Sequence, residues 1–263
     1  MAKELRILVA VKHGIDVGLA RADRATGVVA LDAAPRKTSD FDRNAVEEAV
    51  RIREKHGGKV TAISIGTPAA KEALRDALAI GADEAILVTE PATPSFDTRA
   101  VARILAAVSR TLGGFDIFLL GEGSSDHFAG VVGPQLAAEL GVADVAYVRK
   151  LTVEETGVLV EKDLEREIEL VRARFPVVLT VGQEINTPRL PTFMATLKAS
   201  KKEIRQWGIS ETGLRPEEVS ATVRIDRAAV PDIPRKQVVI SGGTPDELAR
   251  ALVQSLRSEG VIP

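Results

Sequence analysis

Short apolar runs alternate with segments of helical periodicity in the first half of the chain, and this alternation limits the fold more than any other feature. Ile7–Val11 is a β-branched run bounded by polar residues, and the helical pattern of Ala45–Ile52 follows it. Further strands are expected at Val60–Ile65, Ala85–Val88 and Phe115–Leu120, with helices after Thr67, over Asp97–Leu112 and over Ala129–Leu140. The sequence therefore predicts an α/β fold with a mainly parallel, doubly wound sheet.

Three loops are expected to meet at one edge of this sheet, after Val11, Ile65 and Leu120. Open parallel sheets bind ligands at the carboxyl ends of their strands, where the strand order reverses. The architecture alone therefore points to a nucleotide in these loops.

Glycines and serines fill the loop between the fourth strand and the fourth helix. Gly121 and Gly123 allow backbone conformations that expose N–H groups, and Ser124 and Ser125 add hydroxyl donors. The helix N-terminus that follows carries partial positive charge, which suits a phosphate. Because no lysine follows in a GKS or GKT pattern, this is not the phosphate loop of an NTPase.

The composition excludes several classes of function. Without cysteine the chain has no disulfide, thiolate nucleophile or iron–sulfur ligand, and its three scattered histidines do not suggest a metal site. A net charge of −2 and 3% aromatic residues do not suit nucleic acid. No run approaches the roughly 18 apolar residues of a membrane span, and Ile7–Val11 is too short for a signal-peptide core. A cytoplasmic protein is expected. The sequence offers no candidate catalytic residue, because Glu47 and Glu48 are interpreted as surface charges.

The second half has a different pattern. Val158–Lys162 and Glu167–Arg174 alternate like antiparallel strands, and Pro176–Val181 is a further apolar strand. The chain after Thr187 is polar and irregular, and Glu203–Arg235 reads as an extended arm. A last helix is expected from Thr244, where the spacing to Glu247 is that of a capping box. Its apolar stripe of Leu248, Leu252 and Leu256 can dock on its own domain or on a partner.

Five segments in this order resemble the beta subunit of the electron transfer flavoproteins. They are Ile7–Lys12, similar to that family's first strand; Phe41–Ala49, similar to its asparagine-proline-phenylalanine loop and AVEEA helix; Leu74–Asp83, similar to its LRxALAxGAD run; Gly121–Gly141, similar to its phosphate loop and helix; and Pro188–Arg189 with Lys198–Lys202, similar to its proline-arginine and KAKKK stretch. Leu74–Asp83 is the most specific match.

This resemblance implies a Rossmann-like, adenine-nucleotide-binding fold and a heterodimer. The alpha subunit would hold an electron-carrying FAD, and this chain would bind a second nucleotide, either AMP or, in electron-bifurcating members, FAD. Dehydrogenases would donate electrons, and a quinone oxidoreductase or another acceptor would receive them. Such a protein is an electron carrier subunit rather than a stand-alone enzyme. The implied division is a nucleotide-binding domain over 1–187, a partner recognition loop and basic segment over 188–205, and an arm and helix contacting the alpha subunit over 206–263.

The resemblance also assigns site residues. The nucleotide-binding positions are Ala10, Ser39, Asp40, Phe41, Asp42, Ile65, Gly121, Gly123, Ser124, Ser125, Asp126, Gly130, Val131 and Val132. Ser39 and Asp40 replace the family's asparagine and proline, and Val131 stands where many relatives have glutamine. Asp126 is expected to cap the helix or to order the loop, and the VGPQ sequence from Val132 favours FAD over AMP.

Phe193 and Met194 are the expected partner-binding positions, because Phe193 matches the family's hydrophobic anchor for dehydrogenases. An exposed anchor and burial against the chain's own domain both stay open at this point. Lys198, Lys201 and Lys202 can steer a partner or form a solvated face.

Two other classes of protein fit the sequence less well. A stand-alone adenine-nucleotide-binding module of the stress-protein type would leave Pro188–Lys202 and the arm unexplained. A conventional NAD-dependent oxidoreductase needs a GxGxxG after the first strand, and Lys12–Asp16 offers none.

Overall fold

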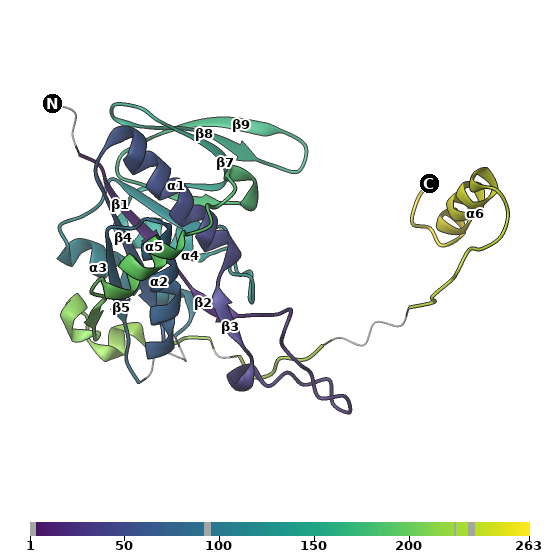
Figure 1. The fold of residues 1–263 in the computed structure, drawn as a ribbon, viewed down its shortest axis with the longest axis horizontal. Coiled ribbons are helices and arrows are strands. Elements are labelled where there is room, and N and C mark those ends of the chain that lie inside the picture. Colours follow the sequence, from purple (N-terminus) through teal and green to yellow (C-terminus); the bar gives the residue numbers. More distant parts are fainter. Residues whose placement is uncertain (1–3, 92–95, 224, 231–234) are drawn as a thin grey trace.

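A nine-stranded sheet with the strand order β11-β5-β4-β1-β6-β10-β7-β8-β9 forms the centre of the molecule in the computed structural model (Figure 1). The structure describes residues 4–91, 96–223, 225–230 and 235–263. The sheet strands are β1 (Arg6–Ala10), β4 (Lys59–Ile65), β5 (Glu84–Val88), β6 (Ile117–Gly121), β7 (Ala143–Val153), β8 (Gly157–Asp163), β9 (Ile168–Arg174), β10 (Val177–Val181) and β11 (Arg205–Trp207). The pairings are parallel from β11 to β7, and β7-β8-β9 is antiparallel. These pairings confirm the predicted fold class.

Helices cover both faces of the sheet, and the last helix of the chain lies apart from it. The helices are α1 (Asp40–His56), α2 (Lys71–Ile80), α3 (Thr98–Thr111), α4 (Val132–Leu140), α5 (Phe193–Lys201) and α6 (Pro245–Ser258), and β2 (His13–Ile15) pairs with β3 (Arg36–Thr38) in a separate hairpin. Successive residues of β1 point to opposite faces, so Ile7 and Val9 pack beneath α1 and α2, whereas Leu8 packs beneath α3 and α4. Apolar residues on both faces are what a buried parallel strand requires.

Local signals explain where several elements begin and end. Asp97 caps α3, because its side chain accepts a hydrogen bond from the N–H of Ala100 at 2.9 Å. Gly58 must be glycine, since its φ is +111° and a Cβ there would lie 2.1 Å from the carbonyl oxygen of Leu5. That close approach brings the end of α1 back into β4.

The chain beyond Thr187 is more regular than its sequence suggests. Residues predicted to be irregular form α5, because Thr192 caps the helix through a hydrogen bond from the N–H of Ala195. The stretch predicted as an extended arm begins with β11, which pairs with β5, and Ile209 and Val219 are buried beneath α3. Three-residue elements have no periodicity that a sequence pattern can reveal. The division into units over 1–187, 188–205 and 206–263 stays a prediction. Residues 1–3, 92–95, 224 and 231–234 of these units lie outside the described residues.

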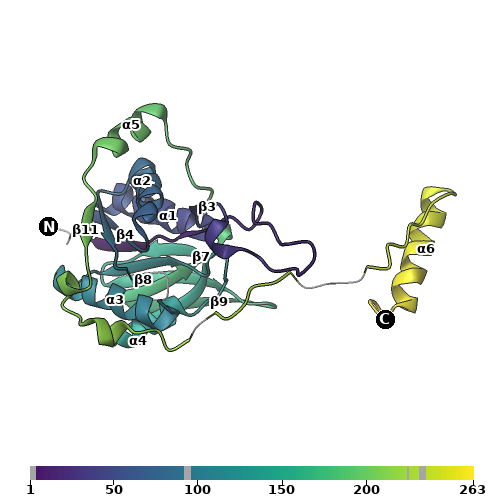
Figure 2. The ribbon, with the colours of Figure 1, turned by 90° about the horizontal axis from the view of Figure 1, so that it is seen from below.

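The last helix begins where the sequence predicts. Thr244 and Glu247 form a reciprocal capping box, and Pro245 occupies the first turn. None of the helix residues is buried, Leu252 is 50% exposed, and Figures 1 and 2 show α6 apart from the α/β domain. In the described part of the chain no helix is both long and apolar enough to cross a membrane. The cytoplasmic location stays a prediction.

Candidate functional site

The carboxyl ends of β1 and β6 lie side by side where the strand order reverses. From β1 the sheet continues through β4 on one side and through β6 on the other. β1 ends at Ala10 and β6 ends at Gly121, so two predicted site residues open the two loops at this point. Open parallel sheets bind ligands at such a position.

Asp42 joins the first turn of α1 to the ends of both strands. Its Oδ2 accepts a hydrogen bond from the backbone N–H of Lys12 at 2.7 Å, and its Oδ1 accepts one from Gly121 at 3.2 Å. Burial raises the pKa of Asp42 to about 7, although both amides and the Lys12 charge favour the carboxylate. The carboxyl group therefore fixes the spacing of β1 and β6 beneath the site.

Lys12 holds the loop after β6 against the residues that follow β1. Its Nζ lies 2.6 Å from Oδ1 of Asp126 and donates to Oγ of Ser124 at 3.1 Å. The other oxygen of Asp126 accepts a hydrogen bond from the N–H of Ile15 at 3.0 Å. Desolvation opposes ionisation of Asp126, but hydrogen bonds from His127, Lys12 and Ser124 outweigh it and hold the pKa of Asp126 below its ordinary value.

The start of α1 also contacts this loop. The backbone N–H of Asp40 donates to Oγ of Ser125 at 3.1 Å, and that hydroxyl donates to Oδ2 of Asp40 at 3.4 Å. The N-cap position is held by Ser39, whose side chain does not cap the helix, and whose buried Oγ has no hydrogen-bond partner within the described residues. The sequence placed Asp40–Asp42 in a loop, which is wrong, because they form the first turn of α1. The Asp40 carboxylate in this first turn favours the helix dipole.

Two phenylalanines close one side of the site. The ring centroids of Phe41 and Phe128 are 5.4 Å apart, and Phe128 is more than half exposed. A Cβ on Gly121 would lie 2.6 Å from Cβ of Phe41, and one on Gly123 would lie 2.8 Å from the Phe128 ring. Both glycines are therefore required by the close approach of these side chains, and neither has the positive φ that only glycine adopts readily.

The fourth helix begins three residues later than the sequence predicted. Its N-cap is Val131, which provides no side-chain cap, and Gly130 precedes it with a φ of +68°. Asp126 therefore does not cap this helix; of its two expected roles, the structure gives it the ordering of the loop. The first amides of α4, those of Val132 and Gly133, receive no side-chain cap from the described residues.

Ala10 and Ile65 are less closely involved than the loop residues. Both pack against the apolar cluster beneath α3 and α4. The structure adds Lys12 and Phe128 to the site, and neither was predicted from the sequence. A single lysine after a strand or a single phenylalanine in a loop forms no sequence motif that would indicate a site. Only the fold brings these two residues to the ends of β1 and β6.

A second surface lies on the segment that leaves α1 at Arg189 and packs against α2. Residues 190–202, here called the docking segment, contain Leu190, Phe193 and Met194, which are 86%, 80% and 56% exposed. Phe193 is therefore not buried against its own domain. Apolar side chains gathered on one exposed segment are typical of a surface for another protein.

The described residues fit a bound nucleotide. Ser39 has a buried hydroxyl without a partner, α4 has an uncapped first turn, and Lys12 neutralises the nearby carboxylate of Asp126. These donors suit phosphate oxygens, and the exposed Phe128 ring suits an aromatic ring system.

Comparisons with known proteins identify the family of the chain. A family model described as the electron transfer flavoprotein domain matches residues 26–212. The chain is 37% identical to the electron transfer flavoprotein subunit beta of Thermoanaerobacterium thermosaccharolyticum, over 98% of this chain and all of that protein. It is 31% identical to the corresponding subunit of Bacillus subtilis, over 90% of this chain and 92% of that protein.

A further relative has a more specific name. The caffeyl-CoA reductase-Etf complex subunit CarD of Acetobacterium woodii is 30% identical over 98% of this chain and all of that protein. Matches of this extent cover the α/β domain and continue through the C-terminal residues. The chain therefore belongs to the electron transfer flavoprotein family, among its beta subunits.

Proposed function

We propose that this beta subunit binds a second nucleotide, FAD or AMP, at the carboxyl ends of β1 and β6 while its alpha subunit partner holds the electron-carrying FAD. Electron transfer is the function of the family, and an alpha subunit is the partner that a beta subunit implies. One observation supports the nucleotide proposal. Asp42 at the N-terminus of α1 and the loop held by Lys12 meet at the ends of β1 and β6, and this loop leads into the uncapped start of α4.

Each group in this site has a distinct task in the proposal. The backbone amides of Gly130–Val132 and the hydroxyls of Ser39 and Ser124 hold phosphate oxygens. Asp42 keeps the two strand ends in place, and Phe128 lies against a ring of the ligand. A bound flavin supplies the chemistry of accepting and releasing electrons. The protein contributes binding, orientation and exclusion of water.

The docking segment is proposed to receive dehydrogenases, with Phe193 and Met194 as the central contacts. Exposed aromatic and methionine side chains are enriched at the centres of such interfaces. In the proposal the electron acceptor is a quinone oxidoreductase or a similar protein.

The identity of the second nucleotide is tested by releasing it from the heterodimer under mild denaturation and analysing its mass and absorbance. Two FAD per heterodimer would support flavin in the beta site and electron bifurcation. One FAD with one AMP would support a structural nucleotide and a single-flavin carrier. A heterodimer with FAD alone and no second nucleotide would contradict the proposed site.

A further inference from the structure

Helix α5, which carries Phe193, is too short to be stable alone. It has nine residues, and Ala199 is the one that is buried. Helices shorter than about 12 residues are marginal in water, and most helix stability in proteins comes from packing. Something outside the helix must therefore hold the docking segment in its observed conformation.

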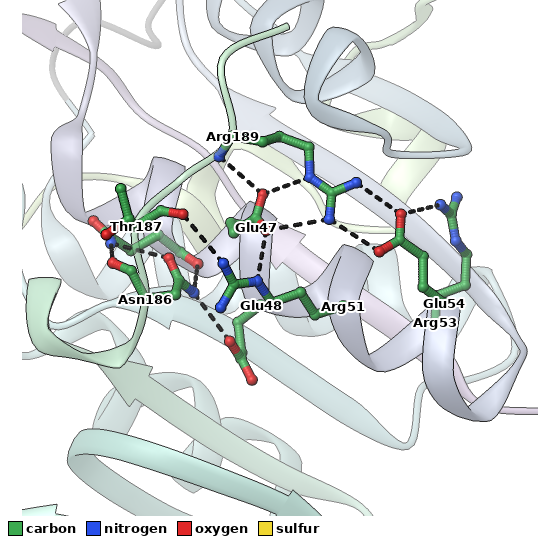
Figure 3. Close-up of polar contacts among 9 residues, drawn as sticks. Glu47, Glu48, Arg51, Arg53, Glu54, Asn186, Thr187 and Arg189 are labelled. Carbon is green, nitrogen blue, oxygen red and sulfur yellow. Dashed lines mark hydrogen bonds and ion pairs between the residues drawn. The ribbon is translucent and has the colours of Figure 1, made fainter.

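Arg189 fixes the front end of the docking segment to α1 (Figure 3). Its Nε lies 2.8 Å from Oε2 of Glu47, and its Nη1 and Nη2 lie 2.7 and 2.9 Å from the two oxygens of Glu54. The backbone N–H of Arg189 also donates to Glu47 at 3.1 Å. Glu47, interpreted from the sequence as a surface charge, is 1% exposed. One guanidinium thus joins two carboxylates that stand two turns apart on the helix.

The residues just before Arg189 contact the same side of α1. The Asn44 amide donates to the carbonyl oxygen of Asn186 at 2.7 Å, and the Asn186 amide donates to Glu48 at 3.0 Å. Arg51 donates to the carbonyl oxygen of Thr187 at 3.2 Å. Positions 44, 47, 48, 51 and 54 form one helical stripe, so the whole approach to the docking segment is fixed along a single helix face.

Arg75 of α2 fixes the back end. Its Nη1 donates to the carbonyl oxygens of Ala199, at 2.5 Å, and of Lys202, which are among the last carbonyls of α5. Lys202 in turn donates from Nζ to the carbonyl oxygen of Ala82 at 2.9 Å, so it is not free to steer a partner. A cation at a helix C-terminus binds carbonyls that have no partner within the helix and opposes their partial negative charge.

We propose that Arg189 and Arg75 are positioning residues that hold the two ends of the docking segment, so that Phe193 and Met194 are presented in a preformed helix before a dehydrogenase binds. This inference rests on the proposed docking function. A surface ordered in advance does not lose that conformational entropy on binding, so the two arginines strengthen docking without touching the partner. They act on the Michaelis constant for the dehydrogenase and leave the maximal rate of electron transfer unchanged.

The test uses the intact heterodimer and a flavin-dependent dehydrogenase that reduces the unsubstituted protein. Arg189→Gln and Arg75→Gln are each expected to raise KM about tenfold, the equivalent of about 1.4 kcal/mol of binding free energy, with kcat and nucleotide content retained. Hydrogen exchange read by mass spectrometry should become faster across residues 190–201. Arg189→Lys keeps the positive charge but cannot bind two carboxylates at once. Its KM and its hydrogen exchange should lie between those of the unsubstituted protein and of Arg189→Gln, and it replaces Arg189→Gln in the test if that variant does not fold.

Two controls separate this inference from the function on which it rests. Arg103→Gln removes another arginine that joins helices, through Glu139 of α4, and should change neither KM nor exchange in residues 190–201. Phe193→Ala reports on docking itself. If Phe193→Ala raises KM but the arginine variants do not, the positioning role is wrong and the docking function stands. If Phe193→Ala has no effect, both are wrong. Faster exchange without a rise in KM, or a rise in KM without faster exchange, also overturns the positioning role.

Discussion

Oδ1 of Asp42 accepts a hydrogen bond from the backbone amide of Gly121 at 3.2 Å, which ties helix α1 to the end of β6. Burial raises the pKa of Asp42 to about 7 from an ordinary value of 3.8. Between these values the folded state binds more protons than the unfolded state. The contribution of Asp42 to the free energy of unfolding is therefore greatest below pH 4 and decreases as pH rises to 7, by at most about 4 kcal/mol.

Asp42→Asn should remove this part of the pH dependence. Urea unfolding of the unsubstituted protein and of Asp42→Asn, at pH 5 and at pH 8, measures this pH dependence. Titratable groups other than Asp42 contribute equally in the two proteins. The free energy of unfolding of the unsubstituted protein should fall more between the two pH values than that of the variant. Parallel pH profiles would show that Asp42 does not titrate in this range.

Asp126→Asn should weaken nucleotide retention. The substitution removes the charge that holds Lys12 and loosens the loop that carries Ser124. Hydrogen bonds to charged groups contribute about 1.5–3 kcal/mol each, so affinity should fall roughly 10- to 100-fold. The pKa of Asp126 is lower in the folded state than in the unfolded state. Its contribution to the free energy of unfolding is therefore present above about pH 4 and is lost as the pH falls further. Equilibrium dialysis of the heterodimer at pH 7 measures the change, and undiminished affinity would contradict the role of the Lys12 contact.

Gly121→Ala should destabilise the site by overpacking. The new Cβ would lie 2.6 Å from both Oδ1 of Asp42 and Cβ of Phe41, and such insertions cost about 1–3 kcal/mol. We expect a lower melting temperature and partial loss of the nucleotide. Gly18→Ala is the matched control, because the nearest atom there lies 3.4 Å away in an exposed loop. Equal effects of the two substitutions would argue against a specific close approach at Gly121.

Phe193→Ala should slow electron exchange with a dehydrogenase while nucleotide content stays normal. Truncating a central aromatic contact commonly costs 2 kcal/mol or more, so KM should rise about 30-fold. Steady-state kinetics over a range of dehydrogenase concentrations measures it. Leu19→Ala removes an apolar side chain that is 60% exposed and lies outside the docking segment, and it should have no effect. Unchanged kinetics for Phe193→Ala would remove this residue from the interface.

Deletion of residues 236–263 should weaken assembly with the alpha subunit. None of the α6 residues is buried in this chain, so its apolar stripe is available to a partner. Size-exclusion chromatography at decreasing protein concentration should show that the heterodimer with the truncated chain dissociates at a higher concentration than the heterodimer with the full chain. Replacement of Leu248, Leu252 and Leu256 by serine should reproduce the deletion if the stripe makes the contact. A heterodimer that stays intact in both cases would contradict the docking of α6.

Alternating periodicities determined the fold class from the sequence, because each buried strand and each amphipathic helix leaves a pattern along a few consecutive residues. The helix at Thr244 was predictable for the same reason, since a capping box lies within four residues. Gly121 and Gly123 could also be selected, because glycines and serines between a strand and a helix are typical of a phosphate-binding loop, although the structure shows that both are glycine because Phe41 and Phe128 pack against them.

Contacts between distant residues were decided by the tertiary structure alone. Lys12 and Asp126 are 114 positions apart, and Glu47 and Arg189 are 142 apart, so no local pattern links them. Glu47 looks like a solvated charge on an amphipathic helix, and it is buried only because the fold brings a guanidinium to it. Helix α5 was missed because two arginines at its ends supply the stability that its own nine residues lack. The sequence by itself determined the parallel sheet, most of its helices and the edge at which a ligand is expected, whereas long-range hydrogen bonds and ion pairs decided which side chains meet at the two surfaces.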